Sequence, residues 1–198
     1  MKKILLSAIA VFAFSFANAQ EESDFGFSKG DVLVEGNLSL TSKSVPDGNS
    51  TKTTTSYGFA PVGGYFLSDN FALGLGLNIS SDKENSREVN TFGVGVFGRY
   101  YFLELGQRFK VYGQAGLGFD SINDKVADAK STEFGFHAGL GMNYFLTKSF
   151  AINFGLTDIF SVVNNKPKNG DGTTTVNFNV NKFNNFFTTP TFGLSFRF

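Results

Sequence analysis

Apolar residues alternate with small, polar or charged residues over most of the chain, and the last eight residues show this pattern most plainly. Phe192, Leu194, Phe196 and Phe198 fall on one face of an extended strand, and Arg197 falls on the other face among small residues. A strand of a soluble sandwich also alternates, but it rarely sets a charged residue behind a row of aromatic residues at the end of the chain. A strand of a membrane barrel explains the arrangement, because one of its faces meets lipid and the other meets a polar lumen.

The same period of two recurs in eight segments of the chain. The clearest is 71–80, where Phe, Leu and Ile alternate with Ala, Gly, Asn and Ser. The weakest is 56–65, because Pro61 cannot donate to a strand ladder and predicts a bulge at that point. The eight segments are about 31–40, 56–65, 71–80, 91–100, 109–119, 133–144, 150–157 and 186–198.

The connections between these segments alternate between short and long. The short ones are 67–70, 103–108 and 146–149, and the long polar ones are about 41–55, 81–90, 120–132 and 161–185. Outer-membrane barrels have short periplasmic turns and longer extracellular loops, whereas a sandwich has no reason to sort its loops in this way. We therefore predict an all-β, eight-stranded antiparallel up-and-down transmembrane barrel over 31–198, with both ends of the mature chain on the periplasmic side.

The first 19 residues have the features of a signal peptide. Lys2 and Lys3 precede an apolar run, and Ala17-Asn18-Ala19 is a typical cleavage site, so 1–19 is predicted to be removed. An N-terminal transmembrane anchor is the alternative, but spanning needs about 20 apolar residues and this run is shorter. We expect 20–30 to form a short periplasmic segment, and we expect no periplasmic wall-binding domain, because the barrel occupies the rest of the chain.

Composition removes several classes of function. The chain has no cysteine, which excludes disulfides and thiolate metal sites, and its 17 basic and 17 acidic residues leave no positive field for nucleic acid. Its 26 Phe and 23 Gly suit strands better than helices. The chain has no D-x-D-x-D-G run of the kind that binds calcium, and Asn169-Gly170-Asp171-Gly172 is typical of a turn. We expect no metal, no cofactor and no nucleic-acid partner.

Aromatic residues flank both kinds of connection, which predicts two girdles at the two membrane interfaces. The alternative interpretation is the aromatic core of a soluble sandwich. The residues beside the short turns are Tyr65, Phe66, Phe71, Tyr100, Tyr101, Phe102, Phe109, Tyr144, Phe145, Phe150 and Phe198. Those beside the long connections are Phe59, Phe92, Phe119, Phe134 and Phe160.

Several short motifs together resemble the outer-membrane beta-barrel domain family, the small eight-stranded barrels also called porin-family or OmpX-like proteins. They are PVGGYFLSDNFALG at 61–74, RYYF at 99–102, YGQAGLG at 112–118 and the terminal Phe198. The resemblance implies that the protein is a monomer, embedded in the lipids of the outer membrane of a Gram-negative bacterium. It also implies insertion by the barrel-assembly machinery, with Phe196 and Phe198 as the assembly signal. It implies no defined substrate, so the porin label does not carry an activity with it.

Alternation places three acids, three bases and a histidine inside the barrel. An eight-stranded barrel is only wide enough for side chains to fill it, and an unpaired charge in such a space is costly. We therefore predict a structural network of ion pairs, and the alternative is a narrow channel for water or small ions that these residues gate. The predicted lumen residues are Asp31, Glu35, Arg99, Lys110, Glu133, His137 and Arg197.

The sequence favours a structural or surface-interaction role over catalysis. His137 is the single histidine, and barrels resembling lipid A deacylases place a serine two residues from their histidine, where this chain has Gly139. A lipid-modifying enzyme is thus the weakest alternative. The stretch Thr173 to Val180 alternates again, so it is either a hairpin that projects beyond the membrane and binds a surface protein, or a solvated loop.

Overall fold

The structure, a computed structural model, describes residues 25–47, 50–84, 87–178 and 191–198. It confirms the prediction of an all-β fold. Within the described ranges, no helix is long and apolar enough to span a membrane. The strands are β1 (Val32–Asp47), β2 (Ser50–Ser68), β3 (Phe71–Glu84), β4 (Arg87–Leu105), β5 (Phe109–Asp124), β6 (Ala129–Phe145), β7 (Phe150–Pro167), β8 (Thr173–Phe178) and β9 (Thr191–Arg197).

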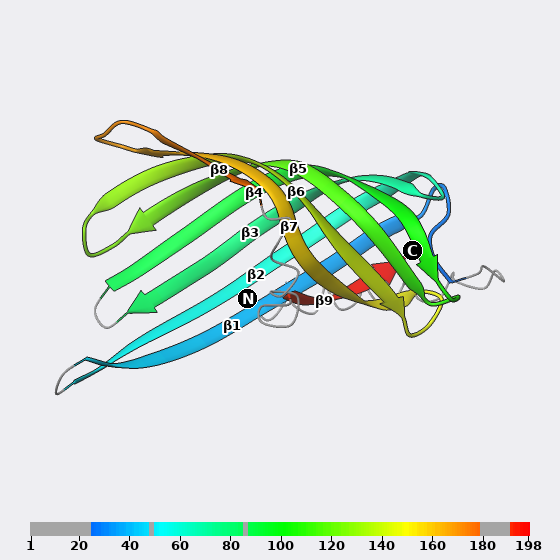
Figure 1. The fold of residues 1–198 in the computed structure, drawn as a ribbon, viewed down its shortest axis with the longest axis horizontal. Coiled ribbons are helices and arrows are strands. Elements are labelled where there is room, and N and C mark those ends of the chain that lie inside the picture. Colours follow the sequence, from blue (N-terminus) through cyan, green and yellow to red (C-terminus); the bar gives the residue numbers. More distant parts are fainter. Residues whose placement is uncertain (1–24, 48–49, 85–86, 179–190) are drawn as a thin grey trace, which may run out of the picture.

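The strands close into a barrel, as predicted (Figure 1). Strands β1 to β7 pair antiparallel in chain order, and β9 pairs with both β7 and β1. Strand β8 pairs with the outer part of β7, so β8 and β9 occupy successive stretches of the eighth position. Val32 and Phe198 exchange backbone hydrogen bonds of 2.8 and 3.0 Å at the seam. Of the predicted eighth segment, 186–190 lies outside the described residues.

The seam matters because lipid offers no partners to backbone N–H and C=O groups, so an open edge in the membrane is unfavourable. The predicted assembly-signal residues lie at this seam. Phe196 is opposite Val34 of β1 and Phe150 of β7, and its ring lies 4.9 Å from that of Phe150. The terminal aromatic strand is therefore an integral part of the closed wall.

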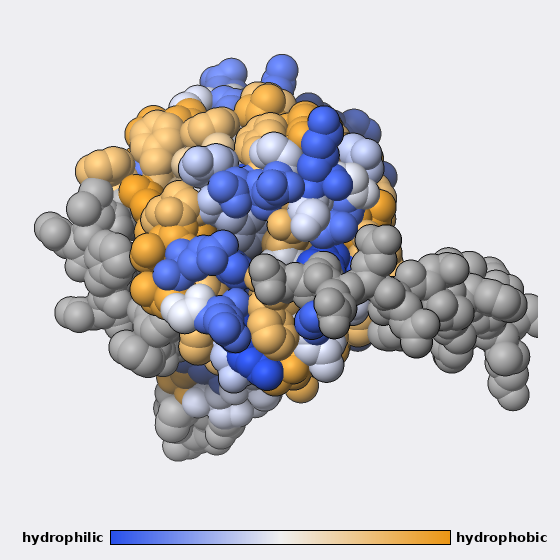
Figure 2. All heavy atoms as spheres, turned by 90° about the vertical axis from the view of Figure 1, so that its right-hand side faces the viewer, coloured by the Kyte–Doolittle hydropathy of each residue, from blue (hydrophilic) through white to orange (hydrophobic). Residues whose placement is uncertain are grey.

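Over the middle of the barrel, most apolar side chains face outward and most small or polar ones face inward, as the alternation predicts. In β3, Leu73, Leu75 and Leu77 are exposed on the outer surface, whereas Ala72 is fully buried. Figure 2 shows the end of the barrel that carries the short turns, where hydrophilic residues gather over the end and hydrophobic residues surround it. This is the surface pattern of a protein that spans a bilayer.

The long connections are mostly strands rather than the loops predicted. The β1–β2 ladder continues to the pair Asp47–Ser50, and the β3–β4 ladder continues to the pair Glu84–Arg87. In Figure 1 these hairpins extend from the end opposite the short turns. A membrane-spanning strand needs only about 9–11 residues, and β2 has 19. The β-branched Thr residues of these extensions favour strands, and both faces are mostly polar because neither meets lipid.

The predicted bulge at Pro61 is wrong. The ladder from β2 to β3 omits the pairs at Ala60 and Pro61 but keeps the same register on both sides, and Pro61 pairs normally with Gly36 of β1. The missing proline N–H therefore interrupts the pairing to β3 without adding a residue. The register shifts instead lie between Phe66 and Ser68, between Tyr101 and Leu103, and twice around 138–141 opposite β7.

The predicted aromatic girdles are partly wrong. Beside the short turns, Tyr65, Tyr100 and Phe102 face outward and are exposed. Phe66, Tyr101 and Phe145 were assigned to the same girdle, but they are buried inside the barrel. Each of these three residues comes two positions after an inward-facing residue of the same strand, so the alternation itself turns its side chain inward. The inward-facing residues are Gly64, Arg99 and Asn143. Beside the long connections, Phe59, Phe92, Phe119 and Phe134 are exposed as a girdle requires.

The segment before β1 closes the end of the barrel that carries the short turns. The ring of Phe27 stacks on that of Phe66 at 4.3 Å, and the Gly26 carbonyl accepts a hydrogen bond of 2.6 Å from Arg197. The Arg108 guanidinium lies 4.5 Å from the ring of Phe25. Of the predicted periplasmic segment 20–30, residues 25–27 thus pack into the barrel mouth and 28–30 are exposed, while 20–24 and the predicted signal peptide at 1–19 lie outside the described residues.

Candidate functional site

A buried ion pair occupies the middle of the lumen. Arg99 of β4 donates to both carboxylate oxygens of Glu35 of β1, at 2.7 and 2.8 Å, and both side chains are at most 3% exposed. Ser195 of β9 donates to the same carboxylate at 2.8 Å, and the amides of Asn143 and Asn153 approach it at 3.4 and 3.3 Å. Five strands thus contribute to the site, and the charge of Glu35 is met by donors on all sides.

Two tyrosines hold this cluster in place. The Tyr101 hydroxyl donates to Asn143 at 2.8 Å, and the Tyr112 hydroxyl donates to Asn153 at 2.7 Å. The ring of Tyr112 also lies 4.0 Å from the Arg99 guanidinium carbon, a cation–π contact. A side chain at Gly141 would overlap this ring, so glycine is required where the Tyr112 ring lies against β6.

Aromatic rings fill the lumen between this cluster and the periplasmic end. Phe27 lies 5.1 Å from Tyr101 and 5.2 Å from Phe145, in addition to its stack on Phe66. Phe66, Phe145 and Leu33 are at most 1% exposed. The ion-pair cluster and these rings together form the plug, and it leaves the described part of the lumen closed at this level.

The seven predicted lumen residues do not form one network. Glu35 and Arg99 pair at the centre. Arg197 lies 3.6 Å from Asp31 at the periplasmic end. Lys110 pairs at 2.7 Å with Glu104, an acid that the sequence analysis did not place in the lumen. Two of the three predicted bases therefore pair with predicted acids, and the third, Lys110, pairs with Glu104 instead.

Glu133 and His137 lie nearer the extracellular end and away from the central pair. Glu133 accepts a hydrogen bond of 3.2 Å from Asn165, and His137 Nδ1 is 3.8 Å from a carboxylate oxygen of Asp158. Asp158 is the second acid that sequence reasoning missed. His137 is about half exposed and lines the lumen cavity, so the histidine predicted to lie inside the barrel is accessible to solvent.

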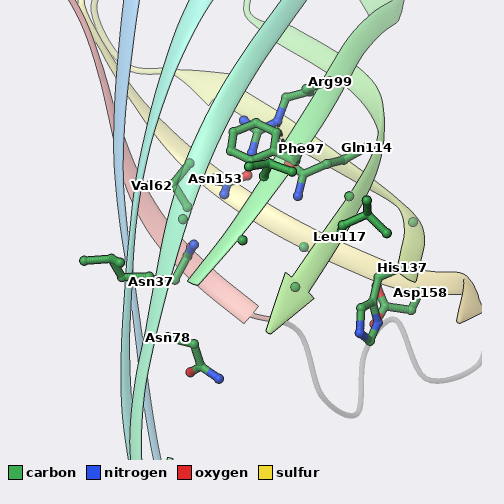
Figure 3. A pocket seen from close by; sticks show the side chains of 18 of the residues that line it. Asn37, Val62, Asn78, Phe97, Arg99, Gln114, Leu117, His137, Asn153 and Asp158 are labelled. Carbon is green, nitrogen blue, oxygen red and sulfur yellow. Dashed lines mark hydrogen bonds and ion pairs between the residues drawn. The ribbon is translucent and has the colours of Figure 1, made fainter. Parts of the chain in front are cut away.

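Above the plug, the lumen opens to the outside as a cavity of about 560 Å³, lined by both polar and apolar residues. Arg99, Gln114 and Asn153 lie together at one end of the cavity, and His137 and Asp158 lie side by side at another (Figure 3). Inward glycines such as Gly95 and Gly116 leave this space unfilled. Among the described residues, no group of three or more His, Cys, Asp or Glu side chains could hold a metal ion. The geometry suits a water-filled vestibule closed at its base.

Known proteins agree with this architecture. Residues 6–183 match the Outer membrane protein beta-barrel domain family. The outer membrane protein OprG from Pseudomonas aeruginosa is 13% identical, with 87% of this chain and 98% of that chain covered and a TM-score of 0.51.

Two other solved structures are also similar. Outer Membrane Protein W of E. coli is 15% identical, with 86% and 99% of the two chains covered and a TM-score of 0.46. Ail of Yersinia pestis is 15% identical, with 86% and 99% covered and a TM-score of 0.45. No curated protein matches this chain. With the closed barrel, the apolar outer surface and the match over most of its length, the chain belongs to the Outer membrane protein beta-barrel domain family and is located in the outer membrane.

Proposed function

We propose that this protein is a closed outer-membrane barrel with a structural and surface-interaction role, which it performs through its extracellular hairpins. The observation that supports this most directly is the plug, in which the Glu35–Arg99 pair and the rings around Phe27 fill the lumen. A passive channel needs a continuous aqueous path. Here such a path would have to displace a charge pair with at most 3% exposure and several packed rings.

Single-channel recording of the purified protein in planar bilayers tests the closed lumen. We expect no steady conductance steps under conditions where a trimeric porin, used as the control, conducts. Steady steps of the wild-type protein would establish the narrow-channel alternative instead. Recording a Phe27→Ala variant in parallel shows whether removing only the periplasmic rings admits ions.

The hairpins are suited to present side chains outside the membrane. In β7–β8, Asn164 donates to the Thr174 hydroxyl at 2.9 Å, so polar side chains connect the two strands. Every residue of β8 is exposed, and Val176 and Phe178 form an apolar pair at 62% and 69% exposure. The pairing of β8 with β7 over 173–178 supports the projecting hairpin over the solvated loop. An ordered hairpin with exposed apolar residues favours contact with another protein.

A photo-crosslinking residue placed at Val176 of the protein on intact cells tests this interaction. We expect protein adducts at Val176 that are missing at Leu75, an exposed residue of the lipid-facing wall. Deletion of 165–181 should leave the barrel folded, as judged by different gel mobility before and after boiling, and should remove the adduct-forming partner. Equal labelling at both positions would contradict the proposal.

We propose no catalytic role. Activation of a nucleophile needs a base within about 2.6–3.2 Å, and the structure supports no such unit at His137, whose Nδ1 faces Asp158 at 3.8 Å and whose neighbour two residues on is Gly139. Lipid mass spectrometry of a deletion strain tests this directly. A change in the acylation of the outer-membrane lipids, restored by the wild-type gene but not by His137→Ala, would establish the enzyme alternative.

A further inference from the structure

The outer surface of β1 to β5 changes in three steps toward the extracellular end. The first step is an apolar row of directly opposed residues on neighbouring strands: Leu38, Phe59, Ile79 and Phe92. Ile79 is the ninth residue of β3, counted from the short turn, and a transmembrane strand has about 9–11 residues. The apolar row therefore lies at the outer edge of the hydrocarbon layer.

On β3 to β5 the next row outward is small and polar. It contains Ser81, Asn90 and Asn123, and on β2 and β1 the ladder continues to the large residues Tyr57 and Leu40. The difference in size between the two rows leaves a groove of about 860 Å³ on the wall, lined by both. Ser81 is 4% exposed, and its hydroxyl has no hydrogen-bond partner among the described residues. A buried hydroxyl without a partner is unfavourable, so a ligand that accepts from it is stabilised there.

The third row is charged and lies where lipid headgroups begin. Lys83 and Glu88 are directly opposed, and Lys125 pairs with Glu88 at 2.6 Å. The Lys83 ammonium lies 5.9 Å from the ring of Tyr57, at the outer end of the groove. With two lysines against one glutamate, this end of the groove carries a net positive charge.

We propose that the groove binds one lipid of the outer leaflet, a phosphorylated and acylated glycolipid. An acyl chain lies in the groove along the apolar row, a carbonyl or hydroxyl oxygen of the lipid accepts from the Ser81 hydroxyl, and a phosphate lies at Lys83. A zwitterionic phospholipid offers the same chains but no net charge for the lysine. A free sugar phosphate offers the charge but no chain for the groove.

Native mass spectrometry of the full-length barrel in detergent tests this site, with diphosphorylated lipid A as the probe. We expect one lipid A per barrel to be retained, in preference to phosphatidylcholine and to glucosamine phosphate. A lysine near a membrane surface contributes about 1 kcal/mol of attraction, so Lys83→Gln should weaken retention about fivefold. Lys148→Gln, at a turn on the periplasmic end, is the matched control and should have no effect.

Two changes at Ser81 separate the groove from general charge attraction. Ser81→Ala should weaken lipid A retention while the lipid-free barrel stays as stable as the wild type or becomes more stable, because an unsatisfied hydroxyl is removed. Ser81→Phe should abolish retention by filling the groove, and gel mobility before and after boiling shows whether it folds. Wild-type retention by both Lys83→Gln and Ser81→Ala would overturn the proposal, as would equal retention of phosphatidylcholine or glucosamine phosphate.

Discussion

Removing the arginine of the central ion pair should be the most damaging single change in the lumen. In Arg99→Met, Glu35 keeps its neutral donors but loses both short hydrogen bonds from the guanidinium, at 2.7 and 2.8 Å, and stays buried. Removing one partner of a buried pair costs about 3–5 kcal/mol, because the remaining charge is uncompensated. With a urea m-value of about 1–3 kcal/mol/M, the unfolding midpoint should fall by at least about 1 M.

The assay is urea unfolding of the detergent-solubilised barrel, followed by far-UV circular dichroism and by gel mobility without boiling. The double variant Glu35→Gln/Arg99→Met should be more stable than Arg99→Met alone, because it carries no buried charge. Lys148→Met is the matched control, since Lys148 lies at an exposed turn, and it should change the free energy of unfolding by no more than about 1 kcal/mol. If Arg99→Met costs no more than this control, the lumen is hydrated and the proposed plug is refuted.

Three further predictions concern packing and charge elsewhere. Phe27→Ala should lower the free energy of unfolding by about 1–3 kcal/mol in the same assay, because a partly buried ring is lost from the plug. Gly141→Ala should destabilise the barrel by about 1–3 kcal/mol, because the new methyl group overlaps a lumen tyrosine, whereas Gly118→Ala meets no atom within 4 Å and should be nearly neutral. Outside the membrane, the pKa of Asp124 is lowered first by a hydrogen bond from the backbone N–H of Ala127 and then by Arg87. The ionised carboxylate should therefore stabilise the β5–β6 turn above about pH 4, and this stabilisation should be lost as the pH falls through the folded-state pKa. Amide hydrogen exchange of the turn, compared with that of Asp124→Ala, checks this.

The alternation in sequence was sufficient to predict the fold and the inward direction of the central charges. A period of two sets the face of each residue, so Glu35 and Arg99 were placed in the lumen without any structure. Asn143, Asn153 and Ser195 share the inward face, but they were not named as site residues, because an uncharged side chain gives no signal of its own. Their convergence on Glu35 depends on the stagger of five strands around the barrel, which local sequence does not determine.

Two acids were missed because bulges reverse the alternation. Between Tyr101 and Leu103 the register with β5 shifts by one residue, and Glu104 thereby comes opposite Lys110 on the same face. In β7 the shifts around Leu156 and Ile159 likewise bring Asp158 opposite Gly139, on the face of His137. A bulge adds one residue to one strand, so every side chain beyond it changes face. No residue in either stretch marks the bulge in advance, whereas the proline that was expected to mark one did not.

The inward glycines explain why one barrel holds both a plug and a vestibule. In the plug, rings lie flat against the wall where a strand offers no side chain: Phe97 covers Gly74, and Tyr112 covers Gly141. In the vestibule, Gly118 faces open space, because no neighbouring strand supplies a large residue at that height. The same residue type therefore either accommodates a ring or leaves a cavity, and the outcome depends on the residue directly opposite on the neighbouring strand. The lumen is closed where large and small residues alternate around the barrel, and it is open where small residues face one another.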